Sequence, residues 1–317
     1  MLKTTLELRE ITTGLRFPEG PIAMPDGSVI VVEIEGGRLI RVTPDGGKQI
    51  VAELGGGPNG AAIGADGKCY VCNNGGFNWL THDDGFLRPH GIADSYAGGS
   101  IQRVDLASGA VETLYSHCGD VQIRGPNDIV CDADGGFWFT DYGKIYDRLI
   151  DRGAIYYARI DGSFITEAAF PTITANGIGL SPDGKTLYAA ESDTGKLWGW
   201  PVLGPGELGK VPWPNMAGGR FLNAVRAYQR FDSLAIEANG NVCVATMGAG
   251  GIDAGISVFA PDGELVEFHR APEYYCTNIA FGGADMRTAF ITLSGYGRLV
   301  AVDWPRPGLP LVHQLAG

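Results

Sequence analysis

Six polar residues recur at one position of a repeated sequence pattern. In five of the six copies, an Asp-Gly or Asn-Gly turn follows at a constant spacing after a short apolar segment. The residues, in chain order, are Glu19, Asn59, Asn127, Asn176, Asp232 and Thr277. Each side chain carries an oxygen atom, and two are acids. Oxygen ligands of this kind suit hard cations such as Ca²⁺ and Mg²⁺, so the candidate chemistry is the binding of a divalent metal.

The segments around these lead residues predict the elements that position them. Two apolar strands joined by the turn are followed by a third strand, as in GRLIRVTPDG from residue 37, and by a weaker fourth. A recurring unit of four short strands is typical of a propeller blade. The sequence therefore predicts an all-β fold, a six-bladed β-propeller with four-stranded blades, as a single domain over residues 1–317. We expect segment 6–12 or segment 309–315 to close the last blade.

The lead residues should meet, because the innermost strands of a propeller surround its central channel. A single Asn or Asp before a strand is usually a turn residue. Two carboxylates in a narrow channel, however, repel each other unless a cation or a proton compensates. We expect one divalent cation, Ca²⁺ by preference with Mg²⁺, Mn²⁺, Zn²⁺ or Fe²⁺ as alternatives. Its ligands would come from this ring of lead residues.

Several motifs together resemble one known family over essentially the whole chain. They are FPEGP at 17–21, GPND at 125–128, ANGIGLSPDGKTLYAAES at 175–192, FDSLAIEANGN at 231–241 and CTNIAFGG at 276–283. The sequence is similar to the family of senescence marker protein (regucalcin), gluconolactonase and luciferin-regenerating enzyme. The resemblance implies a six-bladed propeller with a cation on its axis, held by Glu19, Asn176 and Asp232. Asn127 matches a position that is either a fourth ligand or a substrate contact.

The activity that this resemblance implies is the opening of a lactone by metal-assisted attack of water. Asp232 is the expected general base, and Asn127, Asn59 and Arg124 are expected to contact the substrate. Arg124 is the nearest match to an arginine that contacts the sugar lactone in animal members, with a spacing that differs by one residue. Asp128 should point to the opposite face of its strand, which favours a structural role. No G-x-S-x-G motif indicates a serine nucleophile.

Two other functions remain open at this stage. A distant relative of the diisopropyl fluorophosphatase type uses a similar ring of acids and amides, so a metal-dependent arylesterase or phosphotriesterase is one alternative. A noncatalytic ligand-binding propeller is the other, since fold does not fix function.

An insert at about 73–99 separates the second and third lead residues. These two lie 127 − 59 = 68 residues apart, against 59 − 19 = 40 for the preceding pair. Long loops in compact domains are often lids or binding loops; the alternative is a loop that packs on its own blade and does not contact substrate. Phe77 and Trp79 are therefore candidate substrate contacts, and we expect the insert to determine which lactone is accepted.

Composition excludes several other classes of function. The net charge of −12 argues against nucleic acid and anionic membranes as partners, since both require a basic surface. The N-terminus lacks an apolar leader and no segment approaches the length of a membrane span, so we expect a cytoplasmic protein. We also expect a monomer or small homo-oligomer whose partner is a small-molecule lactone. The six cysteines lack paired metal spacing and are expected to be buried free thiols.

Overall fold

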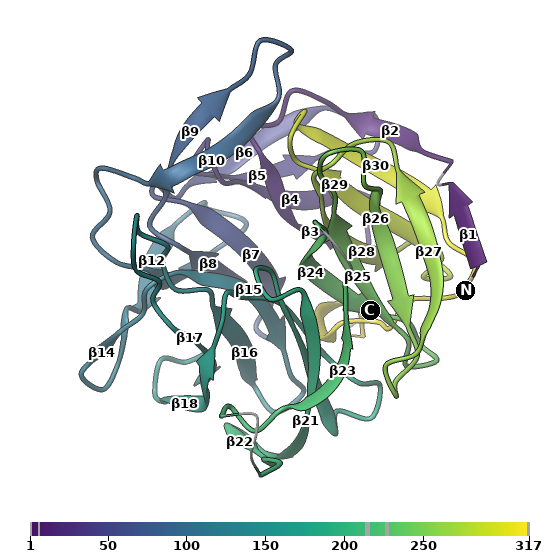
Figure 1. Ribbon diagram of the computed structural model, residues 1–317. Helices are drawn as coiled ribbons and strands as arrows, with labels where there is room; N and C mark the ends of the chain where they lie inside the picture. The colour runs from purple at the N-terminus through teal and green to yellow at the C-terminus, as the bar shows by residue number, and fades with distance from the viewer. Residues whose placement is uncertain (1, 6, 213–215, 226–227, 316–317) are drawn as a thin grey trace.

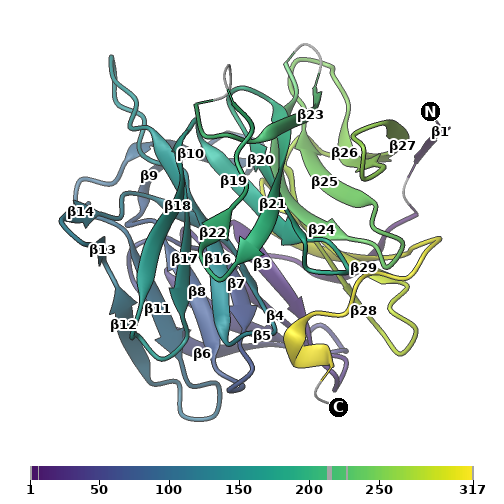
Figure 2. The ribbon, with the colours of Figure 1, turned by 90° about the horizontal axis from the view of Figure 1, so that it is seen from below.

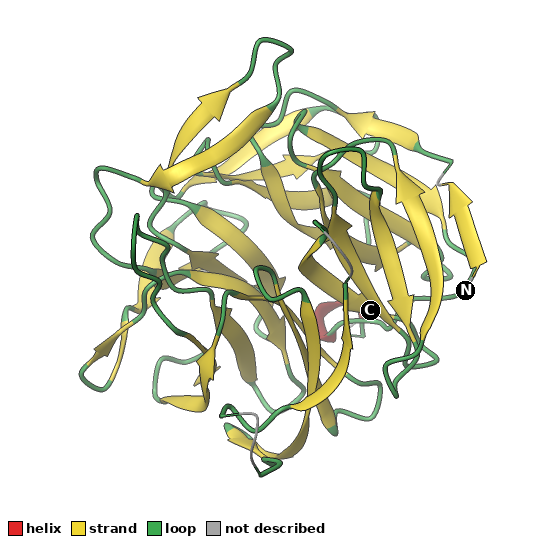
Figure 3. Ribbon diagram, viewed as in Figure 1, coloured by secondary structure: helices red, strands yellow, loops and turns green. Residues whose placement is uncertain are grey.

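The computed structural model describes residues 2–5, 7–212, 216–225 and 228–315. Six β-sheets surround a central axis (Figure 1), which confirms the predicted six-bladed propeller. In the described residues the only helical element is the 3₁₀ turn η1 (Val312–Gln314), and Figure 3 shows the dominance of strands. No helix in these ranges is long and apolar enough to cross a membrane.

The first three blades follow the predicted four-stranded pattern. Blade 1 contains β3 (Pro18–Ala23), β4 (Val29–Glu33), β5 (Arg38–Val42) and β6 (Lys48–Glu53). Blade 2 contains β7 (Pro58–Ile63), β8 (Cys69–Asn73), β11 (Ser100–Val104) and β12 (Val111–Tyr115). Blade 3 contains β15 (Pro126–Cys131), β16 (Gly136–Asp141), β17 (Gly153–Arg159) and β18 (Ile165–Thr172). Two separate hairpins are β9 (Phe77–Thr81) with β10 (Leu87–Ile92), and β13 (His117–Cys118) with β14 (Val121–Gln122).

The last three blades include the strands that close the ring. Blade 4 contains β19 (Ala175–Leu180), β20 (Thr186–Glu191), β21 (Lys196–Gly204), β22 (Glu207–Leu208) and β23 (Arg220–Ala224). Blade 5 contains β24 (Arg230–Ile236), β25 (Val242–Met247), β26 (Ala254–Phe259) and β27 (Leu265–Ala271), with β1 (Leu2–Thr5) parallel to β27. Blade 6 contains β28 (Cys276–Gly282), β29 (Thr288–Leu293), β30 (Arg298–Asp303) and β2 (Arg9–Thr12). The N-terminal strand β2 therefore completes the last blade by pairing with β30.

Burial falls from the axis outward in each blade. In blade 1 every residue of β3 and β4 is buried, whereas most of β6 is exposed. The apolar clusters lie between neighbouring blades; one, for example, joins Trp138 and Tyr157 of blade 3 to Leu187 and Trp200 of blade 4. All six cysteines are free, and all except the half-buried Cys118 are buried. Packing between blades therefore fixes the positions of the inner strands.

Every inner strand has an irregularity in its pairing at or next to the lead residue. In β3, for example, the register with β4 shifts between Glu19 and Ile22, and the other five inner strands shift in the corresponding place. A β-bulge of this kind leaves residues unpaired and changes the direction of their side chains. The strict alternation of faces therefore fails at the lead positions.

The turn after the inner strand has a different residue in the sixth copy. Five copies place a glycine with positive φ there, such as Gly27 at 81°. The sixth copy is one residue longer and places Met286 in this left-handed conformation, with φ 58°. Glycine adopts that conformation without a steric penalty, whereas a side chain makes it less favourable. The turn of blade 6 therefore keeps the left-handed conformation although its residue is not glycine.

The inner strands begin on one face of the ring and end on the other. The C-terminal segment covers the end face, where His313 Nε2 donates to Ala23 O at 3.2 Å, at the end of β3. Figure 2 shows η1 beneath the sheets and the β9–β10 hairpin on the opposite side. Segment 309–315 is therefore not the strand that closes blade 6, because β2 occupies that place.

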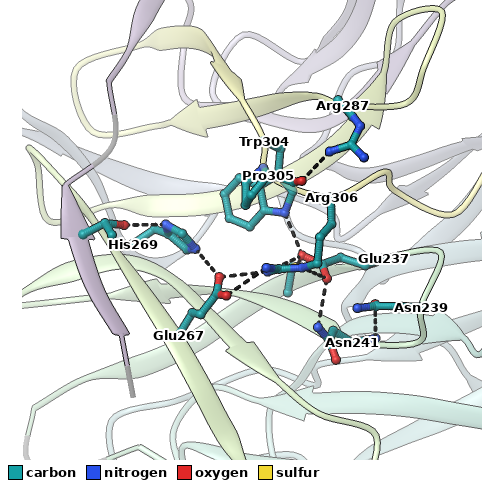
Figure 4. Close-up of polar contacts among 11 residues, drawn as sticks. Glu237, Asn239, Asn241, Glu267, His269, Arg287, Trp304, Pro305 and Arg306 are labelled. Atoms are coloured by element: carbon teal, nitrogen blue, oxygen red, sulfur yellow. Dashed lines mark hydrogen bonds and ion pairs between the residues drawn. The ribbon is translucent and has the colours of Figure 1, made fainter.

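A buried ion-pair network joins blades 5 and 6 (Figure 4). Glu237 is fully buried and accepts hydrogen bonds from Trp304 Nε1 at 2.7 Å and Arg306 Nε at 2.6 Å. The same guanidinium donates two hydrogen bonds to Glu267, each 2.8 Å long, and His269 contacts Glu267 at 2.9 Å. A bidentate guanidinium holds both carboxylates in fixed geometry. The network therefore links the last two blades beside the N-terminal strand.

Candidate functional site

A cavity of about 390 Å³ opens on the face where the inner strands begin. Its polar residues include five of the six predicted lead residues: Glu19, Asn59, Asn127, Asn176 and Asp232. All five are buried, with at most 9% of their surface exposed. The side chains come from five different blades, so only closure of the ring brings them together. The cavity size suits a small organic ligand.

The rest of the lining is largely apolar and aromatic, with a few cations. Phe17 and Ile34 come from blade 1, and Phe77 and Ile92 come from the β9–β10 hairpin. Further lining residues are Asn74, Arg88, Tyr142, Lys144, Ser192, Arg230, Met247 and Tyr275. None of the five histidines, all within the described ranges, lines this cavity. The arrangement therefore provides an apolar wall above an oxygen-rich ring.

Hydrogen bonds orient the oxygen atoms of the ring. Glu19 Oε2 accepts from Asn278 Nδ2 at 2.7 Å and from the Gly20 amide at 2.8 Å. Asn176 Nδ2 donates to Ser192 Oγ at 3.0 Å, and Asn176 Oδ1 accepts a long, 3.5 Å hydrogen bond from Ser233 Oγ. This long bond leaves Oδ1 able to accept from a ligand as well. Asn127 Oδ1 is buried and has no hydrogen-bond partner in the described part of the chain. A buried acceptor without a partner is costly unless a ligand satisfies it.

Burial raises the pKa values of three carboxyl groups near the axis, those of Glu19, Asp128 and Asp232. Burial raises the pKa of Asp232 well above its ordinary value, and the negative charge of Glu19 raises it further. Burial also raises the pKa of Glu19, although hydrogen bonds from Asn278 and Gly20 oppose this. The pKa of Asp128 is raised to about 7, first by burial and then by the charge of Glu19. A divalent cation would favour the charged forms of all three groups.

The donor set fits a hard divalent cation. Two carboxylates and two amide oxygens, one of them without a partner, are the ligand types that Ca²⁺ and Mg²⁺ prefer. No group of three His, Cys, Asp or Glu side chains suited to a metal occurs among the described residues. A metal in this ring would therefore depend on the amide oxygens of Asn127 and Asn176 as well as on the acids.

Three sequence-predicted residues lie outside the cavity lining. Arg124 Nη1 donates to Gln122 Oε1 at 2.9 Å, and Arg124 lines a separate surface hollow. Trp79 packs on Phe17 at a centroid distance of 5.0 Å and supports the wall from behind. Thr277 bonds Ser294 and Thr292 in blade 6. Phe77, in contrast, lies in the lining as the sequence predicted.

The insert is an ordered hairpin anchored on a distant blade. The Leu87 amide donates to Gly295 O at 2.8 Å, and Phe86 packs on Tyr275 and Tyr296 of blade 6. Tyr296 Oη also donates to Asp84 Oδ2 at 2.8 Å. These contacts link an insert of blade 2 to blade 6. The hairpin therefore forms a fixed wall of the cavity.

Sequence reasoning missed the cations of the cavity and the position of Asp128. Arg88 lies in the insert that the sequence singled out, but its own signal is weak. Lys144 follows β16 and Arg230 is the first residue of β24, and neither belongs to a distinctive motif. Asp128 is buried and lines the cavity at the opposite end of the channel, together with Gly20 and Asn278. The alternation argument fails for Asp128 because β15 is bulged there.

Comparison with known proteins places this geometry in a family. A family model described as the SMP-30/gluconolactonase/LRE-like region matches residues 17–295. The lactonase drp35 of Staphylococcus saprophyticus is 28% identical over 71% of this chain and 61% of its own length. The gluconolactonase of Zymomonas mobilis is 24% identical over 93% of this chain and 81% of its own length.

The fold comparison agrees with this placement. A calcium-binding protein, regucalcin, from Agrobacterium tumefaciens superposes with a TM-score of 0.71 at 18% identity, over 98% of this chain and all of that one. This chain covers less than two thirds of the length of two lactonases drp35, 61% for the S. saprophyticus protein and 49% for that of Staphylococcus haemolyticus. Because the family model matches residues 17–295, most of the sequence, the chain belongs to the SMP-30/gluconolactonase/LRE-like family.

Proposed function

We propose that this protein hydrolyses lactones with one divalent cation, Ca²⁺ by preference, held by Glu19, Asn127, Asn176 and Asp232. The observation that carries the proposal is the unpartnered, buried Asn127 Oδ1 beside two desolvated carboxylates in an open cavity. This is an arrangement that is unfavourable without a cation and ready to bind one. The names of the relatives supply the reaction class.

The cation, when bound, supplies Lewis acidity that polarises the lactone carbonyl. The protein residues have separate tasks in this proposal. Asp232 holds the attacking water and accepts its proton, as a general base at hydrogen-bonding distance would, and returns this proton to the ring oxygen as the acyl C–O bond breaks. Asn59 and Asn127 orient the hydroxyl groups of the ring, and the faces of Phe77 and Tyr275 pack on its apolar side. Ser192 fixes the amide of Asn176 through the 3.0 Å hydrogen bond.

The reaction needs no covalent intermediate with the protein. Neither a histidine nor a cysteine lines the cavity, and Ser192 Oγ accepts a hydrogen bond from Asn176, so no Ser-His pair exists there among the described residues. Water is therefore the proposed nucleophile. A single turnover in ¹⁸O-labelled water should place the label in the product carboxylate, whereas an acyl-enzyme detected by mass spectrometry would contradict direct attack.

The decisive experiment compares the calcium-loaded and chelator-treated protein on several substrate classes by proton release. The panel contains aldonolactones, aromatic lactones, aryl esters and a paraoxon-like phosphotriester. We expect calcium-dependent hydrolysis with lactones fastest. Fastest turnover of the phosphotriester or the aryl esters would replace the proposal with the diisopropyl fluorophosphatase type of activity. Binding of lactones without any turnover would identify a noncatalytic propeller.

A further inference from the structure

One lysine in the cavity wall has an unusual environment. Lys144 follows β16 and is 97% buried, with 3% of its surface exposed. Its ammonium group lies 4.6 Å from the ring centre of Phe77 and 4.7 Å from that of Tyr96, both in the insert. It donates one long hydrogen bond, 3.4 Å, to Gly76 O. Two aromatic faces stabilise a cation, but they leave donor hydrogens of the ammonium group unused.

The nearby acids in the described part of the chain form no ion pair with Lys144. Asp141 accepts hydrogen bonds from three backbone amides, those of Arg124, Gly125 and Gly143, at 2.7 to 2.8 Å. No carboxylate in the described part of the chain lies within ion-pair distance of Lys144 Nζ. Burial lowers the pKa of Lys144 to about 8, while the charges of Asp141 and Asp151 oppose that shift. The group is therefore mostly charged at neutral pH, and a buried charge without an ion-pair partner is costly.

A second cation of the lining also lacks an acidic partner. Arg88 Nε contacts His82 Nε2 at 3.1 Å and Arg88 Nη1 donates to Pro89 O at 3.3 Å, whereas no carboxylate within the described ranges pairs with it. Arg230 differs, because Asp193 pairs with it at 3.2 Å. Once the proposed cation offsets Glu19 and Asp232, the positive charge of Lys144 and Arg88 remains in the cavity. A cavity lined by uncompensated cations attracts anions.

We infer that the lactone taken by this cavity carries an additional anionic group, a carboxylate, sulfonate or phosphate, which Lys144 and Arg88 bind. The inference rests on the proposed function for the reaction, but the anion contact is a property of the two cations alone. An anion in the cavity would accept the unused hydrogens of Lys144 and form a charge-assisted pair with the Arg88 guanidinium. Lys144 and Arg88 are thus specificity-determining residues.

The competing explanation is that Lys144 only anchors the insert through its contacts with Phe77 and Tyr96. An anchor would affect stability and all substrates equally, whereas an anion contact affects charged substrates selectively. A matched pair of ligands separates the two roles: D-glucono-1,4-lactone and D-glucaro-1,4-lactone differ only in a terminal CH₂OH or carboxylate. A 6-phosphorylated glucono-1,4-lactone tests whether phosphate replaces the carboxylate.

The test measures kcat/KM on this pair for the calcium-loaded protein and for Lys144→Met, Lys144→Arg and Arg88→Gln. Lys196→Met is the control, because Lys196 Nζ also lies over an aromatic ring, Trp198 at 5.6 Å, but outside the cavity. We expect the wild type to prefer the acid lactone by roughly tenfold or more. Lys144→Met and Arg88→Gln should each lower kcat/KM for the acid roughly tenfold and for the neutral lactone less than about threefold. Lys144→Arg should retain most of the preference, and Lys196→Met should retain all of it.

A binding measurement distinguishes failure of this inference from failure of the proposed function. Calorimetric titration compares open-chain glucarate, a dianion, with gluconate, which has a neutral terminus. If no lactone is hydrolysed but glucarate binds tighter than gluconate to the wild type and not to Arg88→Gln or Lys144→Met, the anion contact stands without lactonase activity. Equal binding of the two acids, or a proportional loss on both lactones in every variant, would overturn the inference.

Discussion

Asn278 Nδ2 donates a 2.7 Å hydrogen bond to Glu19 Oε2, which joins the last inner strand of the ring to the first across 259 residues of sequence. This bond orients the Glu19 carboxylate at the cavity. We expect Asn278→Ala to lower calcium affinity roughly tenfold, because partners that orient a ligand typically contribute this much. Calorimetric titration measures it. Asn241→Ala is the matched control, since Asn241 Nδ2 also bonds a carboxylate, Glu237 Oε2 at 2.9 Å, outside the cavity. Equal loss in both variants would assign the effect to stability.

Glu19→Gln and Asp232→Asn should each abolish calcium binding and leave a folded propeller. Both changes remove charge while keeping shape, and both residues are buried in the ring. The metal-free variants should melt at a higher temperature than the metal-free wild type, because repulsion between the two carboxylates disappears. Titration with Ca²⁺, Mn²⁺ and Zn²⁺, together with thermal melting, checks both results. Unchanged affinity in both variants would remove the proposed site.

The stability of the metal-free protein should depend on the protonation of Asp128. Its folded-state pKa is about 7 against an ordinary value of 3.8, first through burial and then through the charge of Glu19. A carboxyl with a raised folded-state pKa favours folding when protonated, so this contribution is complete below about pH 4 and is lost as pH rises through about 7. Calcium should weaken this dependence by favouring the charged form. Melting temperatures at a series of pH values, with calcium or with a chelator, measure the effect. Asp128→Asn should flatten the metal-free curve, and an unaltered slope would contradict the assignment.

The two aromatic residues of the insert should differ in their effect on catalysis. Phe77 lines the cavity and contacts Lys144, whereas Trp79 acts from behind through Phe17. We expect Phe77→Ala to lower kcat/KM for the best lactone roughly tenfold, since each ~1.4 kcal/mol of transition-state stabilisation is worth that factor. Trp79→Ala should cause a smaller loss, and neither change should alter metal affinity. If both lower the melting temperature but leave every rate unchanged, the insert has no part in substrate choice.

Arg306→Met should destabilise the protein without changing its metal affinity. The change leaves the fully buried Glu237 and the half-buried Glu267 without their shared guanidinium (Figure 4). Removing one partner of a buried ion pair costs about 3–5 kcal/mol, although the partial exposure of Arg306 and Glu267 lowers that figure here. Urea unfolding measures the loss. Arg38→Met is the control, because Arg38 pairs with Glu53 on the surface and should cost less than about 1 kcal/mol.

The sequence by itself determined the propeller, because each blade is a local unit of strands and turns that repeats along the chain. Five Asp-Gly or Asn-Gly turns at a constant distance from the lead residue fixed where each inner strand begins. The ring position of Glu19, Asn59, Asn127, Asn176 and Asp232 followed from this repeat alone, and the structure places all five in one cavity. The closing strand remained ambiguous, and pairing of β2 with β30 decided it.

Tertiary structure decided everything that depends on contacts between blades. The sequence placed Asp128 on the wrong face because a β-bulge cannot be recognised from alternation alone. It named Arg124 and did not identify Lys144, because the position of a residue along the chain does not give the direction of its side chain. Arg124 donates to Gln122, while Lys144 lies against two rings of another blade's insert. Asn278 and Glu19 lie at opposite ends of the sequence, and only ring closure brings them together. The local repeat specifies the ring of oxygen-bearing residues. Long-range packing between blades determines which cations and hydrogen-bond partners lie around that ring.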